Sequence, residues 1–148
     1  MLGDLTTDEI NNVLTSQSIC RIACADEGKP YVTPVTYAYD GKYIYIQSKN
    51  GKKVKIMRKN PQVCVQVDIM NNPNFWKSVI VNGVFEELKE ADAEKAKEFL
   101  FNKVLTLLTS STVHGFDHSN ETKVDDTNRN KPVMYRIKIE SITGRYEK

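Results

Sequence analysis

Apolar and polar residues alternate over several short stretches of the chain, which is the pattern of β-strands buried on one face. Asp40-Gly41 separates two of these stretches and is a strong signal for a tight hairpin turn. Gly83 lies inside a longer stretch and predicts a bend there. The expected strands cover residues 18–25, 30–39, 43–48, 62–68, 75–88 and 133–144.

Helical spacing of apolar residues predicts three helices between these strands. The longest carries apolar residues at positions 93, 96, 100, 104 and 107, with charged residues between them. A short helix runs through Leu14 from a cap at Thr7 or Asp8, and another runs from Gly51 to just before Pro61. The region from Thr109 to Lys131 has no periodicity and predicts a long loop.

Strands that follow one another through hairpins, with helices in the gaps, predict a mainly β fold with peripheral helices. The expected architecture is a six-stranded antiparallel barrel. At 148 residues, of which 40% are hydrophobic, the chain fits a single domain spanning residues 1–148. A doubly wound sheet is not expected, because helices do not alternate regularly with strands and no Gly-x-Gly-x-x-Gly turn occurs.

Composition excludes several classes of protein and site. No apolar segment is long enough to cross a bilayer and no signal peptide is recognisable, so we expect a cytoplasmic protein. The three cysteines lie in strand-like stretches and are expected to be buried, reduced thiols. His114 and His118 fall in the predicted loop, and such a pair binds metal well only on a regular helix, so no metal site is expected.

A run of basic residues surrounds the short second helix, although the net charge of the chain is only +2. At about 100° per residue, Lys53 alone falls on the apolar side of this helix. A lysine in the first turn, just after Gly51 and at the positive end of the helix dipole, suits a phosphate, and Ser48 could add a neutral donor. The alternative to a phosphate site is that these basic residues only form a solvated face of the helix. The run consists of Lys49, Lys52, Lys53, Lys55, Arg58 and Lys59.

Two prolines, Pro30 and Pro34, lie in the second expected strand, and each removes a backbone donor. Part of this strand's edge should therefore be unpaired. A flat heteroaromatic ring could bind along it, near Thr33, Val35 and Thr36. The alternative is that the prolines only protect an edge strand from aggregation.

The fifth expected strand begins at the single tryptophan, Trp76, and is nearly continuously apolar through the stretch Ser-Val-Ile-Val at residues 78–81. Strands that are apolar on both faces are usually covered on both. One small barrel cannot supply the second cover, so we expect a homodimer.

Six short motifs occur in order along the chain, each weak alone and specific together. They are Gly-x-Pro-Tyr (28–31), Pro-Val (34–35), Tyr-x-x-Ser (45–48), Gly-x-Lys (51–53), Asn-Pro-x-Val-Cys (60–64) and Trp-x-Ser-Val (76–79). From about Leu5 to Gly144 the chain resembles the FMN-binding split-barrel family related to pyridoxamine 5'-phosphate oxidase. It is most similar to the branch that holds the 5-nitroimidazole-resistance proteins, which often has a histidine where this chain has Gln47.

The resemblance implies a split barrel that binds FMN at a dimer interface. It implies that the backbone of Thr33, Pro34, Val35 and Thr36 runs along the flavin ring, with Gln47 and Ser48 near the ribityl chain and phosphate. It also implies that Lys52 and Lys53 hold the phosphate, and that Trp76 and Ser78 approach from the neighbouring subunit.

These expectations favour an FMN-dependent oxidoreductase that reduces nitro-aromatic or similar small oxidised substrates. A non-catalytic FMN- or haem-binding protein is the alternative. Nucleic-acid binding through the basic run is not expected, because the net charge is low and exposed aromatics do not cluster. No acid–base pair stands out, so the catalytic residues are not identified.

Overall fold

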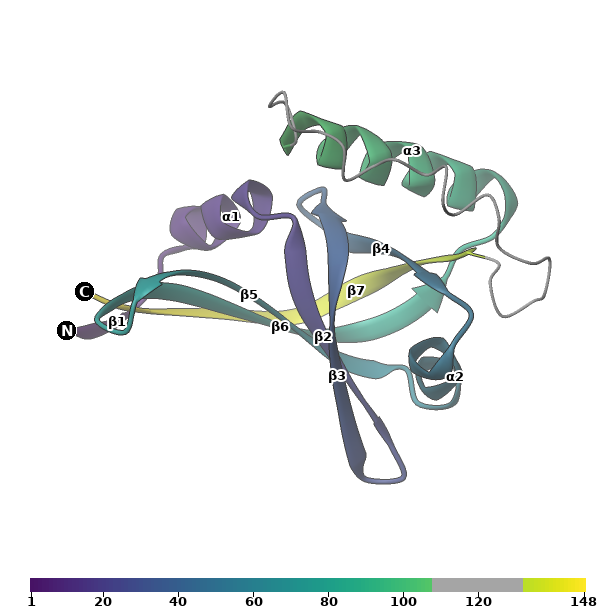
Figure 1. The fold of residues 1–148 in the computed structure, drawn as a ribbon, viewed down its shortest axis with the longest axis horizontal. Coiled ribbons are helices and arrows are strands. Elements are labelled where there is room, and N and C mark those ends of the chain that lie inside the picture. Colours follow the sequence, from purple (N-terminus) through teal and green to yellow (C-terminus); the bar gives the residue numbers. More distant parts are fainter. Residues whose placement is uncertain (108–131) are drawn as a thin grey trace.

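The computed structural model describes residues 1–107 and 132–148 (Figure 1). Its strands form one antiparallel sheet in the order β1-β7-β4-β3-β2-β5-β6, and a further pairing of β7 with β6 closes six of them into a ring. The predicted six-stranded barrel is therefore confirmed, and β1 is an additional strand attached to β7. The strands are β1 (Leu2–Asp4), β2 (Ile19–Asp26), β3 (Lys29–Tyr39), β4 (Tyr43–Lys49), β5 (Gln62–Asn72), β6 (Phe75–Glu87) and β7 (Pro132–Glu147).

Three helices pack around this barrel in the described part of the chain: α1 (Thr7–Ser16), α2 (Lys52–Lys59) and α3 (Glu90–Leu107). The predicted cap of α1 at Thr7 or Asp8 is wrong. Thr6 caps the helix, because its hydroxyl accepts from the Glu9 N–H (3.2 Å) while the Glu9 carboxylate accepts from the Thr6 N–H (2.9 Å). This reciprocal pair needs the acidic residue three positions after the cap.

The ring encloses the main core, which is built from alternate residues of β2 to β7. Its largest fully buried side chains include Tyr37, Tyr135, Ile22, Ile44 and Ile46. A second, smaller core lies where α3 covers the outside of the barrel, and it contains Ala38, Ala96, Leu100, Val104 and Met134. Figure 1 shows α3 lying across one end of the barrel and the β2–β3 hairpin projecting from the other.

Two predictions about single residue types can be compared with the structure. At Gly83, where the sequence predicts a bend, the β6–β7 register shifts: Asn82 pairs with Ser141 and Gly83 with Ile139, so the extra residue lies on β7. A Cβ at Gly83 would collide with the carbonyl oxygen of Lys138. Cys20 and Cys24 are buried free thiols as expected, whereas the free thiol of Cys64 is only half-buried.

Two other predictions concern long segments. The predicted loop from Thr109 to Lys131, with His114 and His118, lies outside the described residues. Within residues 1–107 and 132–148, no helix has both the length and the apolar character needed to cross a bilayer.

The barrel is split between β3 and β4. These strands pair only through Tyr37–Tyr39 and Ile44–Ile46. Beyond Tyr37, β3 stays paired with β2 as far as Lys29, while β4 stays paired with β7 as far as Lys49. We call the place where the two strands part the fork. Residues 30–36 of β3 have one edge that no strand in the described part of the chain covers, and we call it the open edge.

Candidate functional site

The open edge of β3 has a defined set of backbone groups. The Tyr37 N–H donates to the Ser18 C=O on the β2 side (3.0 Å), and the Asp40 N–H donates to the Tyr43 C=O on the β4 side (3.2 Å). Because backbone groups of successive residues point to opposite sides of an antiparallel strand, those of Val32, Pro34 and Thr36 face the open edge. The edge therefore offers N–H donors at Val32 and Thr36 and carbonyl acceptors between them.

The two prolines fit this geometry, because Pro30 and Pro34 both occupy positions that face the open edge. Neither removes a bond to β2. The predicted unpaired edge is confirmed. The same alternation directs the backbone groups of Thr33 and Val35 to β2. These two residues can therefore contact a ligand only through their side chains, which are half-buried.

The predicted residues Gln47 and Ser48 lie on the β4 side of the fork. If the β3–β4 ladder continued by one more pair, Gln47 would face Thr36. Gln47 and Ser48 are neighbours in a strand and therefore point to opposite faces. Ser48 is buried in the barrel, where its hydroxyl is 2.9 Å from the hydroxyl of Tyr135, whereas Gln47 is half-buried on the face that α3 covers.

The basic run is divided by α2 as the helical wheel predicts. Lys53 is half-buried, whereas Lys52, Lys55, Arg58 and Lys59 are exposed. Two of the exposed cations are ion-paired: the Arg58 guanidinium donates to both carboxylate oxygens of Glu87 (2.8 and 3.0 Å), and Lys59 lies 3.4 Å from Asp26. Most of the run is therefore a solvated or ion-paired surface.

Two lysines in the first turn of α2 lie near β2 and β3: Lys52 is close to Tyr31, and Lys53 is close to Cys20 and Cys24. The Lys52 ammonium lies 5.1 Å from the ring centroid of Tyr31, a residue of β3. Burial lowers the pKa of Lys53, although the nearby thiols of Cys20 and Cys24 oppose this shift. Burial also raises the pKa of the Cys20 thiol to about 12, so that neighbour is neutral.

Lys53 is thus a half-buried cation that, within residues 1–107 and 132–148, makes no ion pair or hydrogen bond. A half-buried, uncompensated ammonium group favours an anionic ligand, because the ligand restores the interaction lost with water. α2 also presents its N-terminal amides, and with them the positive end of its dipole, at the same place.

Trp76 and Ser78 are not brought to this place within one chain. They lie on the outer face of β6, which β2 and β5 separate from β3 in the sheet order. The Ser78 hydroxyl accepts from the Gln66 side-chain amide (3.0 Å), and Trp76 is half-buried opposite Met70.

Sequence reasoning did not identify Lys103, another half-buried lysine, which lies on α3. Its ammonium group is 6.0 Å from the ring centroid of Tyr37, the residue at which the open edge begins. Burial lowers the pKa of Lys103 as well. A helical wheel could have found it, because Lys103 follows the buried Leu100 by three positions and directly precedes the buried Val104.

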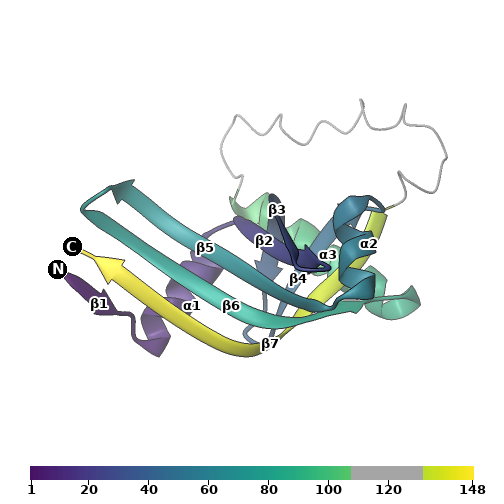
Figure 2. The same ribbon diagram turned by 90° about the horizontal axis from the view of Figure 1, so that it is seen from below.

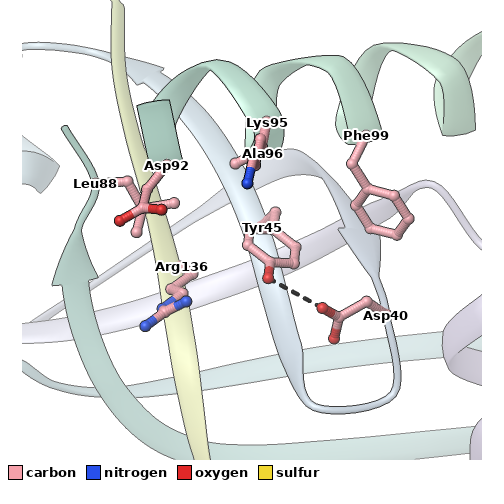
Figure 3. Close-up of a pocket in the computed structure, with 8 residues that line it drawn as sticks. All are labelled: Asp40, Tyr45, Leu88, Asp92, Lys95, Ala96, Phe99 and Arg136. Carbon is pink, nitrogen blue, oxygen red and sulfur yellow. Dashed lines mark hydrogen bonds between the residues drawn. The ribbon is translucent and has the colours of Figure 1, made fainter. Parts of the chain in front are cut away.

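A pocket of about 260 Å³ lies under α3, away from the open edge (Figure 3). Several of its polar groups are paired: the Tyr45 hydroxyl donates to Asp40 (3.0 Å), and Arg136 donates to Glu86 (2.8 Å) while stacking 4.0 Å from the ring centroid of Tyr43. These contacts hold the β3–β4 turn, β4 and β7 together, so the polar groups of the pocket have a structural role.

Comparison with known proteins connects this geometry to relatives. A family model described as pyridoxamine 5'-phosphate oxidase matches residues 6–146. A FAD-binding protein of Mesorhizobium loti of known structure is 34% identical, with 100% of this chain and 98% of that chain covered and a TM-score of 0.76.

A second solved structure and one further protein sequence also match this chain. A putative 5-nitroimidazole antibiotic resistance protein of Bacteroides thetaiotaomicron is 18% identical, covers 99% of this chain and 87% of its own, and has a TM-score of 0.71, which shows a shared fold. An uncharacterized protein of Rhizobium meliloti is 36% identical over 84 residues, and the match spans 57% of this chain and only 56% of that protein.

Proposed function

The chain belongs to the pyridoxamine 5'-phosphate oxidase family, and on this premise we propose that it is an FMN-dependent oxidoreductase whose flavin lies along the open edge of β3. The observation that carries the proposal is a strand edge and a half-buried cation, Lys53 at the start of α2, that are both unpaired within residues 1–107 and 132–148. The name of the Mesorhizobium loti relative, a FAD-binding protein, supports a flavin at this site, with FAD as the alternative to FMN.

The residues present fit the chemistry of a flavin. The pyrimidine end of the flavin ring carries two carbonyl oxygens and one N–H, and the open edge offers N–H groups at Val32 and Thr36 with the carbonyl of Pro34 between them. The phosphate fits the first turn of α2, where Lys53 and Lys52 supply charge and the helix supplies amide donors.

In this arrangement the flavin would supply the redox chemistry, and the chain supplies binding, orientation and charge. The Tyr31 end of the open edge adjoins the cations of α2, so the phosphate belongs there and the ring belongs towards Thr36 and the fork. Gln47, on the other side of the fork, is in place to contact the ring or ribityl chain. A nitro-aromatic or similar flat, oxidised molecule is the proposed substrate class, because such a molecule can stack on a flavin ring.

We further propose that the active form is a homodimer. The outer face of β2, β3, β5 and β6 carries exposed apolar side chains at Ile19, Val32, Met70 and Ile80, with exposed fractions of 56, 64, 63 and 41%. Figure 2 shows β5 and β6, two of these strands, running side by side. A second copy covering this face would bring Trp76 and Ser78 to the partner's flavin, which one chain alone cannot do.

The proposal is tested by mixing the purified protein with excess FMN or FAD, removing free flavin, and recording the visible spectrum and the identity of the released flavin. Stoichiometric FMN supports the proposed cofactor, and stoichiometric FAD corrects it. Protein that retains neither flavin refutes the proposal. Anaerobic mixing with a reduced nicotinamide nucleotide then separates an oxidoreductase, in which the flavin bleaches, from a protein that only binds flavin.

A further inference from the structure

Lys103 lies at the opposite end of the open edge from Lys53. Its ammonium group lies 6.0 Å from the ring centroid of Tyr37, whose side chain is fully buried in the barrel core and whose backbone is the point where the β3–β4 pairing ends. Lys52, next to Lys53, lies against Tyr31 at the other end. Tyr37 follows Tyr31 by six positions along the extended strand, a span of about 20 Å. The open edge therefore has a positive charge near each end, supplied by two different helices.

The two cations cannot have the same role if one flavin lies along the edge. Such a molecule has one phosphate end, which the proposed function assigns to α2, and one ring end. Leu100 and Val104 anchor the C-terminal half of α3 on the barrel, and Lys103 lies between them in sequence, so the backbone that carries the ammonium group is held in place. Lys103 is half-buried, which strengthens its electrostatic interaction with a nearby charge.

We propose that Lys103 is a positioning residue for redox chemistry: its charge lies at the ring end of the site and favours the reduced, negatively charged form of the bound flavin over the oxidised, neutral form. This inference rests on the proposed function. When a flavin ring accepts a hydride from a donor, it gains two electrons and one proton and so gains one negative charge, while the donor becomes one unit more positive. A fixed cation near the ring lowers the free energy of that charge without moving during the reaction.

The test is the midpoint potential of the bound flavin, measured against a reference dye in the wild-type protein and three variants. Lys103→Met removes the charge and keeps an apolar chain, and Lys103→Arg keeps the charge. Lys97→Met removes an exposed lysine from the same helix and serves as the control for net charge. Flavin binding to each variant is measured first from the visible spectrum.

We expect Lys103→Met to lower the ratio of affinities for reduced and oxidised flavin about tenfold, the effect of one pKa unit of charge interaction. That ratio corresponds to a potential about 30 mV more negative for a two-electron couple. Lys97→Met and Lys103→Arg should stay at the wild-type potential. If Lys103→Met binds flavin and keeps the wild-type potential, or if Lys97→Met shifts it equally, the inference is wrong although the proposed function stands. If the wild-type protein binds no flavin, the proposed function itself fails, and this inference fails with it.

Discussion

Replacing Lys53 by alanine should weaken FMN binding much more than replacing Lys55, although each change removes one positive charge from α2. Lys53 is half-buried and has no ion-pair partner within residues 1–107 and 132–148, whereas Lys55 is exposed. A charge-assisted hydrogen bond from a partly buried group contributes about 1.5–3 kcal/mol, so Lys53→Ala should raise the Kd by about one to two decades. Across about 10 Å of water, the charge of Lys55 contributes only about 0.4 kcal/mol before salt screening.

The same change should not destabilise the protein without flavin. Burial lowers the pKa of Lys53, which means that folding disfavours its charged form. The unfolded chain therefore binds the extra proton more tightly, and the unfavourable contribution of Lys53 to stability is fully present at neutral pH. It disappears as pH rises from the lowered folded pKa towards the ordinary value for lysine. Lys53→Ala should remove this alkaline rise in stability.

The assay is a fluorescence titration of FMN with wild-type, Lys53→Ala, Lys55→Ala and Lys52→Ala proteins at one salt concentration, paired with thermal melts of the flavin-free proteins. Equal losses of affinity in all the variants would show that general attraction explains the basic run. A silent Lys53→Ala beside a costly Lys52→Ala would place the phosphate on the Tyr31 side of α2, where the Lys52 ammonium lies.

Three further predictions concern the dimer, an ion pair and a thiol. Ile80→Glu should convert the proposed dimer to monomers in light scattering, whereas Leu105→Glu, at an almost equally exposed position on α3, should not; a dimer that survives Ile80→Glu would place the interface elsewhere. The Arg58 guanidinium lowers the pKa of the Glu87 carboxyl, so Glu87→Gln should cost about 0.5–1 kcal/mol in denaturant unfolding at neutral pH, and this cost should fall as the pH is lowered through the folded pKa and Glu87 becomes protonated. Cys20, whose pKa burial raises to about 12, should resist a thiol reagent in the native protein and react fully in denaturant; rapid native labelling seen by mass spectrometry would contradict its burial.

The strands and helices could be predicted from the sequence because most of them have one buried face, which leaves a period of two or of 3.6 residues in the pattern. The half-burial of Lys53 follows from the same argument, since the wheel of α2 depends only on local geometry. β1 was missed because three residues are too few to show a period. Its position is set by pairing with β7, which is distant in sequence: Leu2 pairs with Glu147 and Asp4 pairs with Arg145.

The limits of the site prediction have a related cause. The prolines indicated that β3 has an open edge. The alternation of apolar and polar residues does not show which backbone groups face that edge, because it is the same for a paired and a free strand edge. Only the register with β2 shows that Thr36 presents its backbone to the open edge while Val35 bonds to β2. The helical wheel of α3 already places Lys103 beside the buried Leu100 and Val104, but only the tertiary structure shows that its ammonium group lies 6.0 Å from the Tyr37 ring centroid.

The fork between β3 and β4 makes the site depend on the order in which the strands assemble. The β3–β4 hairpin is local and can form in microseconds, whereas the pairing of β4 with β7 joins residues as far apart in sequence as Tyr43 and Lys138. Until β7 arrives, nothing holds β4 away from β3, and the hairpin ladder can continue past Tyr37 to bring Gln47 against Thr36. Docking of β7 commits β4 to the other side of the barrel and leaves the edge of β3 free. We therefore expect the candidate binding edge to form late in folding, when β7 pairs with β4.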